Sequence, residues 1–261
     1  MHLILTVCII FSISLVFSMF GKGGGEFYLP TIISILGIPF YTAAGTSVFL
    51  ILMQSISMML VYHLRNKLID WKLAFSLVAT IASMSFLGGF FSYDISAVLL
   101  KVLFAVFLLV SAYFMLREKK VVVKKQRFGV WHREFGDTSY DIHLLLVLPP
   151  VAAISLVVGM IGISGGGLIV PIIILLGGVP LRVAMGTNTF LIFASSSMSF
   201  FGHALRGGVD WKLSMIFGLT VIAGSQVGSR VHTNIKEQHL KLGFVAILVV
   251  AALWMIVRLA V

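Results

Sequence analysis

The stretch that decides the fold is Gly21–Pro30, GKGGGEFYLP, because it occurs a second time as Gly162–Pro171, GISGGGLIVP. The two copies are 141 residues apart, counted from Gly21 to Gly162. The same offset pairs Gly37 with Gly178, Pro39 with Pro180, and Gly45-Thr46 with Gly186-Thr187. After one deletion, Asp70–Leu73, DWKL, recurs unchanged as Asp210–Leu213 at an offset of 140. Glycine, proline and Trp-Lys matches in register indicate an internal repeat.

The composition is typical of a chain that lies in lipid. Hydrophobic residues make up 59% and charged residues 11%, and the mean hydropathy is +1.10. Soluble domains average roughly 45–50% apolar and about 25% charged residues. Such a chain cannot cover a water-facing surface, so we predict an all-α, polytopic integral membrane protein. At about 20 residues per crossing, the length allows roughly 8–10 membrane segments.

The basic residues gather in one segment between apolar stretches. The formal net charge is +10, and its largest cluster lies within 117–141. This distribution follows the positive-inside rule for a cytoplasmic loop and argues against binding of nucleic acid. We therefore predict a first transmembrane repeat over 1–116, a basic cytoplasmic linker over 117–141 and a second transmembrane repeat over 142–261.

Each half contains the same series of apolar segments. The predicted segments are 2–20, 26–37, 41–64, 71–91 and 95–116 in the first half, and 143–161, 167–178, 181–204, 212–229 and 237–258 in the second. Because the first run has a counterpart in the second half, we expect it to stay in the mature protein.

The second segment of each half is too short to cross a bilayer alone. About twelve helical residues rise only some 17 Å, roughly half of the hydrocarbon core. Paired short segments interrupted by Gly and Pro are a sequence pointer to a transport site. If these short helices cross, the repeats are inverted, and if they re-enter, the repeats are parallel. We prefer inverted repeats because they make alternating access simple.

Two glycine loops that lead into the short helices are the first candidate for an anion site. Glycine lets a ligand approach the backbone, and a helix N-terminus presents N–H groups and a positive dipole end. The alternative is that the glycines only allow close helix packing. The candidate residues are Gly21, Lys22, Gly23, Gly24 and Gly25 in one half, and Gly162, Ser164, Gly165, Gly166 and Gly167 in the other.

Polar residues early in the following spans are the second candidates. They are Thr46 and Ser47 in the first half, and Thr187 and Asn188 in the second. Hydroxyl and amide groups bind oxyanions without a fixed charge. The alternative is hydrogen bonding between helices, which is common for Ser and Thr in bilayers. Gln54 is a weaker candidate, and we interpret it as a packing residue.

Lys22 and Glu26 break the repeat, because their counterparts are Ile163 and Gly167. Ionisable groups at membrane depth are costly and usually functional. We expect Lys22 to contact the anion and Glu26 to be the candidate for a coupling proton. The alternative is that the two residues form a neutralised pair near the membrane interface.

The chain shows no pattern for catalysis, a metal or a cofactor. His63 and His203 match at an offset of 140, but no His-Glu-x-x-His and no Walker A motif occur. We therefore predict no enzyme activity, no metal and no cofactor. The expected partners are the lipid bilayer and a small anion, with no nucleic acid.

The duplicated G-x-[GS]-G-G-G/x segments, with a Gly-Thr step and a DWKL-like loop after each, resemble the TauE/SafE sulfite exporter family, also called TSUP. The resemblance covers nearly the whole chain and implies a multi-pass carrier in the plasma (inner) membrane. It implies as substrate a sulfur-containing anion such as sulfite, thiosulfate or an organosulfonate. The residues alone indicate only a small anion.

The hypothesis from the sequence is therefore a secondary transporter that works by alternating access at a midplane site between the two repeats. A passive anion channel and a membrane-embedded enzyme are the alternatives. The chain departs from the family pattern at Lys22 and Glu26, where apolar residues are usual.

Overall fold

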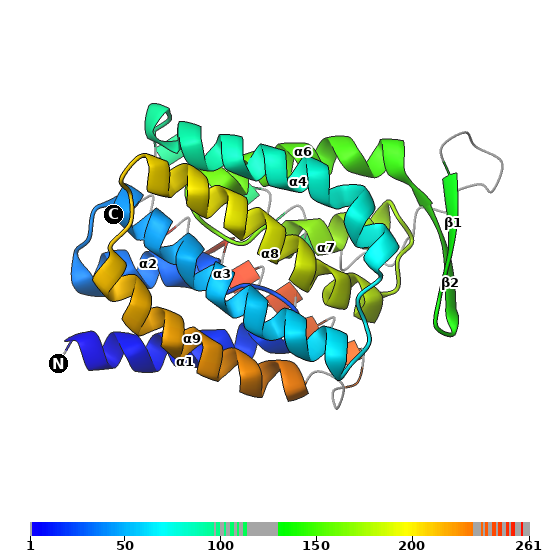
Figure 1. The fold of residues 1–261 in the computed structure, drawn as a ribbon, viewed down its shortest axis with the longest axis horizontal. Coiled ribbons are helices and arrows are strands. Elements are labelled where there is room, and N and C mark those ends of the chain that lie inside the picture. Colours follow the sequence, from blue (N-terminus) through cyan, green and yellow to red (C-terminus); the bar gives the residue numbers. More distant parts are fainter. Residues whose placement is uncertain are drawn as a thin grey trace.

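The fold is a bundle of helices with one small β-hairpin at its end (Figure 1). The structure is a computed structural model, and it describes residues 2–96 and 130–231, with scattered residues between 98 and 113 and between 236 and 257. The predicted segments 95–116 and 237–258, and the part of the linker before residue 130, lie largely outside the described residues.

The helices of the first half are α1 (His2–Met19), α2 (Gly25–Leu36), α3 (Phe40–Leu64) and α4 (Trp71–Phe91), followed by the short helix η1 (Ser92–Asp94). Those of the second half are α6 (Leu144–Ile161), α7 (Gly166–Leu175), α8 (Leu181–Leu205) and α9 (Trp211–Val231). Between the halves lie β1 (Val130–Phe135) and β2 (Thr138–His143).

Glycine and proline set the helix boundaries, as the sequence predicts. Gly37 ends α2 and Gly162 ends α6, both with a positive φ, of 66° and 79°. Pro39 precedes α3 and Pro180 precedes α8 with extended backbone, because a residue locked at φ near −65° without an N–H suits a helix start. The segments predicted within the described residues are confirmed as helices to within three residues at each end.

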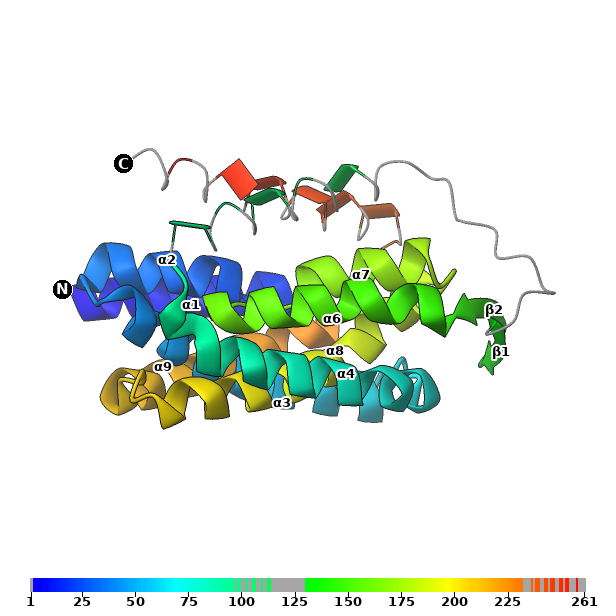
Figure 2. The same cartoon turned by 90° about the horizontal axis from the view of Figure 1, so that it is seen from above.

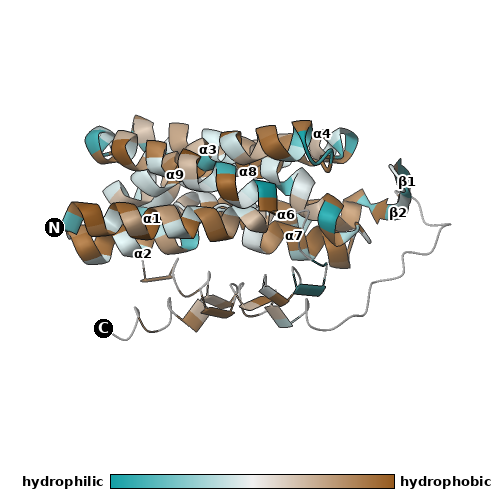
Figure 3. Cartoon of the chain, turned by 90° about the horizontal axis from the view of Figure 1, so that it is seen from below, coloured by the Kyte–Doolittle hydropathy of each residue, from teal (hydrophilic) through white to brown (hydrophobic). Residues whose placement is uncertain are grey.

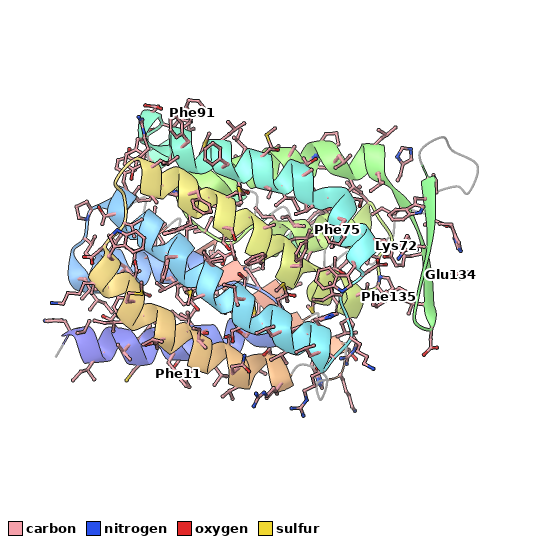
Figure 4. The ribbon with its side chains drawn as sticks, in the orientation of Figure 1. Phe11, Lys72, Phe75, Phe91, Glu134 and Phe135 are labelled. Atoms are coloured by element: carbon pink, nitrogen blue, oxygen red, sulfur yellow. The ribbon has the colours of Figure 1, made fainter. Side chains whose placement is uncertain are left out.

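Four of the described helical segments are long and apolar enough to cross a membrane. They are α1, α3, α4 together with η1, and α6. Large apolar side chains on their outer surfaces are exposed, among them Ile4 and Phe75 at 71% and 61%. Much of the helical ribbon is brown, the colour of hydrophobic residues, in Figure 3, and Phe11, Phe75 and Phe91 are labelled in Figure 4. Lipid is the solvent that such a surface needs, so the chain is an integral membrane protein.

The helices form two layers (Figure 2). One layer contains α1, α2, α7 and α6, and the other contains α9, α3, α8 and α4. In Figure 1, α1 begins at the left edge beside the N-terminus, whereas α6 begins at the right, directly after β2. The first helices of the two halves therefore run in opposite directions.

The halves exchange helices, because the fourth helix of each packs on the first helix of the other. A Cβ atom on Gly88 of α4 would meet the carbonyl oxygen of Leu156 on α6. A Cβ atom on Gly228 of α9 would likewise meet the carbonyl oxygen of Leu15 on α1. These two contacts are counterparts in the repeat, and such reciprocity is what a two-fold relation produces. The orientation of the halves across a bilayer, and so the inverted topology, stays a prediction.

The β-hairpin lies at the end of the bundle and is anchored to it through Asp70. Val130–Phe135 pairs antiparallel with Thr138–His143. Arg133 on β1 donates from Nη2 to both carboxylate oxygens of Asp70, at 2.8 and 2.9 Å, and the Tyr140 hydroxyl on β2 donates at 2.7 Å. The same carboxylate caps α4 by accepting from the N–H groups of Lys72 and Leu73. The sequence indicated only a linker in this region, so the hairpin is a finding of the structure.

Replacing Gly88 with valine should destabilise the packing of α4 on α6. The larger side chain would be forced against the Leu156 carbonyl, and overpacking of a filled interface costs about 1–3 kcal/mol. We expect a lower melting temperature for the purified protein in detergent. Ala79→Val, on the exposed face of the same helix, should leave the melting temperature unchanged. Equal melting temperatures for Gly88→Val and the wild type would contradict this packing.

The Asp70 anchor should make stability depend on pH. Burial raises the pKa of the Asp70 carboxyl, but hydrogen bonds from Tyr140, Arg133 and the Leu73 amide more than offset it, so the pKa lies below its ordinary value of 3.8. A carboxyl with a lowered pKa stabilises the fold above its unfolded-state pKa, and this contribution is lost as the pH falls through the lowered value.

Asp70→Asn keeps a side chain that can cap α4 but removes the charge. We expect it to cost about 1.5–3 kcal/mol at neutral pH, the scale of hydrogen bonds to a charged group. The difference from the wild type should shrink as the pH falls below about 4. Asp94→Asn, which removes an exposed partner of Arg206, is the control. A difference between Asp70→Asn and the wild type that stays constant with pH would refute the assignment.

Candidate functional site

The two glycine loops contact each other in the interior of the bundle. The Ser164 hydroxyl, before α7, donates a hydrogen bond of 2.7 Å to the Gly23 carbonyl oxygen, before α2. A Cβ atom on Gly23 would lie 2.9 Å from the Cβ of Ser164. Gly23 and Ser164 are counterparts in the repeat, so the two loops contact each other at equivalent positions.

The first glycine of each loop packs against the third helix of the opposite half. Gly21 has φ of 60°, and a Cβ there would lie 2.5 Å from the Met185 carbonyl oxygen on α8. Gly162 has φ of 79°, and a Cβ there would lie 2.7 Å from the Ala44 carbonyl oxygen on α3. For these two glycines the structure shows the packing role that the sequence left as an alternative.

Lys22 and Glu26 form an ion pair in the interior. The Lys22 Nζ lies 3.2 Å from the Glu26 Oε1, and both side chains are fully buried. The Ser164 hydroxyl also lies 3.2 and 3.1 Å from the two Glu26 carboxylate oxygens. Its one hydrogen can be donated either to a Glu26 oxygen or to the Gly23 carbonyl oxygen, but not to both at once. The Lys22 Nζ also lies 5.3 Å from the centre of the Phe17 ring. The ion pair that the alternative interpretation expected is thus present and is enclosed by protein, while its position relative to the membrane interface stays a prediction.

Both halves contribute to the surroundings of this pair. Glu26 lies in the first turn of α2. Its counterpart, Gly167, lies in the first turn of α7, where a Cβ would be 2.7 Å from the Lys22 Nζ and 3.2 Å from the Glu26 Oε1. The pair thus occupies the space beside α7 that Gly167 leaves open. The N-terminal ends of two short helices, each with a positive dipole end, lie close to one carboxylate.

Ser47 on α3 and Asn188 on α8 are counterparts, and each has a polar atom that the fold leaves without a partner. The Asn188 Nδ2 donates to the Gly21 carbonyl oxygen at 2.9 Å. Its Oδ1, and the Ser47 hydroxyl, are buried and have no hydrogen-bond partner among the described residues. Buried polar atoms in native proteins are almost always hydrogen-bonded. Each of the two side chains therefore has a polar atom that could bind a ligand.

The two threonines take part in contacts between helices and loops. The Thr187 hydroxyl oxygen on α8 accepts from the Asp70 N–H at 3.0 Å, and the Thr46 hydroxyl oxygen on α3 accepts from the Asp210 N–H at 3.3 Å. This symmetric pair of bonds matches the alternative interpretation, hydrogen bonding within the protein.

The remaining glycines differ in what surrounds them. The Gly24 N–H already donates to the Gln54 side chain, so this amide is occupied. A Cβ on Gly25 would lie 2.9 Å from the backbone of Ile163 and Ser164, and one on Gly166 would lie 2.5 Å from the Asn188 Nδ2. Gly165 is less constrained, because a Cβ there would meet only flexible side chains at 3.0 Å or more.

Gln54 on α3 holds the first glycine loop in place. Its Oε1 accepts from the Gly24 N–H at 3.0 Å and from the Tyr28 hydroxyl at 2.7 Å. Its Nε2 donates to the Ser18 hydroxyl at 2.9 Å and lies 3.3 Å from the Ser14 carbonyl oxygen. The sequence indicated a packing residue, and its buried position, one amide among apolar residues, was the only signal for a larger role.

The two matched histidines lie in separate contacts. The His63 Nδ1 accepts from the Trp71 Nε1 at 3.2 Å, and the His203 Nε2 lies 3.0 Å from the Gly159 carbonyl oxygen. In the described part of the chain, no three His, Cys, Asp or Glu residues are grouped in a way that could hold a metal ion. The site therefore consists of one ion pair, amides and hydroxyls.

The family model of the sulfite exporter TauE/SafE matches residues 6–255 of the chain. The chain belongs to the TauE/SafE sulfite exporter family. This confirms the resemblance inferred from the duplicated glycine motifs.

Curated relatives of this TauE/SafE chain are named as membrane transporters. It is 28% identical over 234 residues to the probable membrane transporter protein YunE of Bacillus subtilis, covering 85% of this chain and 84% of YunE. It is 25% identical over 271 residues to the probable membrane transporter protein MJ0441 of Methanocaldococcus jannaschii, covering 97% and 94%. It is 36% identical over 107 residues, 41% of this chain and 23% of the relative, to the sulfite exporter TauE/SafE family protein 1 of Arabidopsis thaliana. No solved structure gives a significant match.

Replacing Gln54 with leucine should loosen the first glycine loop of this TauE/SafE protein. The Gly24 N–H and the Tyr28 hydroxyl would lose their acceptor, and an unsatisfied buried donor costs about 1–3 kcal/mol. We expect a clear fall in melting temperature. Gln226→Leu, which removes a part-buried amide on α9 that is bonded to Ser57, should cost less. Gln54→Leu as stable as Gln226→Leu would contradict the role of Gln54.

Proposed function

We propose that the chain is a secondary transporter that carries a small anion across the plasma membrane by alternating access. The observation that carries this proposal is the meeting of two glycine loops, one from each half, beside a buried lysine. On α3 and α8, the Ser47 hydroxyl and the Asn188 Oδ1 are buried without a hydrogen-bond partner among the described residues. A site between two repeats, beside the N-termini of short helices, is the arrangement that transporters use for anionic groups.

The proposed substrate is a sulfur-containing anion: sulfite, thiosulfate or an organosulfonate. The family name and the name of the Arabidopsis relative support this class. The chemistry of the site supports an oxyanion in general, because Lys22 supplies a cation close to two positive helix ends and Ser47 supplies a buried hydroxyl on α3. The halves would rock about this site so that it opens to one side at a time.

The proposed topology places the basic linker in the cytoplasm. Residues 117–141 carry the largest basic cluster of the chain, and cytoplasmic loops are enriched in Lys and Arg. The anchor of the hairpin on Asp70 would then stiffen the cytoplasmic end of the bundle.

Ser47→Ala tests the site with the least disturbance of the fold. The Ser47 hydroxyl has no hydrogen-bond partner among the described residues, so its loss should leave stability unchanged. If the hydroxyl donates to the anion, losing a hydrogen bond to a charged group costs about 1.5–3 kcal/mol. We expect the KM for sulfite uptake into proteoliposomes to rise by about 10-fold or more.

Ser55→Ala is the matched control, because Ser55 lies on the same helix and bonds only to the Leu52 carbonyl oxygen among the described residues. It should transport sulfite as the wild type does. An unchanged KM for Ser47→Ala would remove Ser47 from the site. Sulfite flux that never saturates in the wild type would favour a passive channel over a carrier.

A further inference from the structure

We propose that Glu26 is an internal counter-ion which the substrate replaces at Lys22, so that one proton and one monovalent anion cross together without net charge. This inference rests on the proposed transport function and adds to it the charge of the substrate and the coupling ion. It starts from Lys22 and Glu26, whose counterparts in the second half carry no charge.

Among the described residues, the central site brings together the Lys22 ammonium and the Glu26 carboxylate. Their counterparts in the second half are Ile163 and Gly167, which carry no charge. The contacts of the pair include two uncharged groups, the Ser164 hydroxyl and the aromatic ring of Phe17. With Lys22 protonated and Glu26 ionised, the site is neutral.

Neutrality is the state that this environment requires. Both side chains are fully buried, and the effective penalty for an unpaired buried ion is several kcal/mol. An anion that joined the existing pair would leave one uncompensated negative charge. A proton on Glu26 removes this charge, because Lys22 and the anion then form the neutral pair. Anion binding and protonation of Glu26 are therefore linked.

The requirement that the site be neutral also selects a monovalent substrate. A monovalent anion beside Lys22 and protonated Glu26 leaves the site neutral, whereas a divalent anion leaves a net negative charge. Asn188 also favours a monovalent anion over a divalent one. Its Nδ2 is held by the Gly21 carbonyl, which leaves the Oδ1 as an acceptor without a partner among the described residues. An acceptor suits the O–H of hydrogen sulfite and repels a fully ionised oxyanion.

The proton step balances as follows. A hydronium ion on one side gives a proton to a Glu26 carboxylate oxygen, so that an O–H bond of the hydronium breaks and an O–H bond on Glu26 forms. The contact between Lys22 and Glu26 is then replaced by one between Lys22 and the anion. On the other side the anion leaves, the Glu26 O–H bond breaks, the proton passes to water and the ion pair forms again. Ser164 contacts both carboxylate oxygens. It can donate a hydrogen bond to ionised Glu26 or accept one from protonated Glu26, since a hydroxyl both donates and accepts.

Few other titratable groups face Glu26. Lys22 belongs to the same loop, and Tyr28 lies two residues further along α2, where its hydroxyl donates to Gln54. From the second half, the loop before α7 contributes Ser164 and Gly167, and α8 contributes Asn188 to the same region. Glu26 is thus the carboxylate of the described site that can carry the coupled proton.

The first test uses the full-length wild type in proteoliposomes with sulfite as the substrate. A potassium gradient with valinomycin sets the membrane potential, and buffers set the pH gradient. We expect saturable uptake that an inward proton gradient drives and that the membrane potential does not change. Sulfite should produce no current on a solid-supported membrane. A sulfite-dependent current, or an uptake rate that follows the potential, would overturn the inference.

The second test uses Glu26→Gln, which keeps the shape of the side chain but cannot take the charge. In this variant Lys22 has no counter-ion, so the site is neutral only when the anion is bound. When the empty carrier returns to the first side of the membrane, Lys22 is an unpaired cation in the protein interior. We expect proton-driven net uptake to fall by more than about 10-fold, because several kcal/mol oppose this return. Exchange of labelled for unlabelled sulfite should persist, since the carrier has the anion bound each time it reorients during exchange.

Glu134→Gln is the control, because Glu134 lies on the hairpin, outside the bundle (Figure 4), with its side chain 82% exposed. It should keep both net uptake and exchange. Net uptake at the wild-type rate in Glu26→Gln, or loss of exchange in a variant that stays monodisperse and folded, would overturn the inference. If Glu26→Gln does not fold, the charge measurement on the wild type decides alone.

The two proposals fail in different ways. Wild-type protein that shows no saturable flux of sulfite, thiosulfate or a sulfonate would overturn the transport function and this inference with it. Saturable flux that moves net charge would leave the transport function in place and overturn only the role of Glu26.

Discussion

The ion pair between Lys22 and Glu26 lies in the interior of a protein whose solvent is lipid, and the rest of the structure depends on enclosing it. A buried pair is tolerated only when its remaining hydrogen-bonding capacity is met and water or lipid is kept away. Ser164 reaches across from the second half to bond the carboxylate. Gly167 leaves the space in which the lysine lies. Neither half alone can provide this environment, which ties the site to the interface between the repeats.

The glycines that make this enclosure fall into two kinds. Gly21 and Gly162 have positive φ and lie against the backbone of the opposite half, so they bring the halves together. Gly166 and Gly167 lie beside the polar atoms of Asn188 and Lys22, so they make room for the site. A two-fold frame built from duplicated glycines therefore surrounds a site that is itself asymmetric, because one half supplies both charges.

Much of the fold could be predicted from the sequence, because the signals that set it are local. Gly37, Pro39 and their counterparts interrupt apolar runs, and a run's length and hydropathy decide whether it spans. The packing of the fourth helix of each half on the first helix of the other could not be predicted, since the hydropathy of a helix does not indicate which neighbour it packs against. The hairpin was missed because its anchor, Arg133 on Asp70, joins residues 63 apart within a segment whose basic charge dominates the pattern.

Only part of the candidate site could be predicted, because only some of its signals are local in the sequence. The duplicated loops and the broken symmetry at Lys22 and Glu26 are visible in the sequence. The roles of the individual residues depend on distances between the halves, which only the fold supplies. Thr46 and Thr187 looked equivalent to Ser47 and Asn188 in the sequence, yet the threonines accept from loop amides while Ser47 and Asn188 retain unpartnered atoms. Gln54 gave no sign of how many loop groups it bonds.

The central claim is that an anion binds between the two glycine loops, and one measurement tests it most directly. Crystals of the protein grown with selenite, the heavier analogue of sulfite, would locate the anion by the anomalous scattering of selenium. The account predicts a single strong peak within hydrogen-bond distance of Lys22 and next to Ser47 or Asn188, with Glu26 turned away from the lysine. A saturated crystal with its peak at the protein surface, and with the Lys22–Glu26 pair intact, would contradict the account.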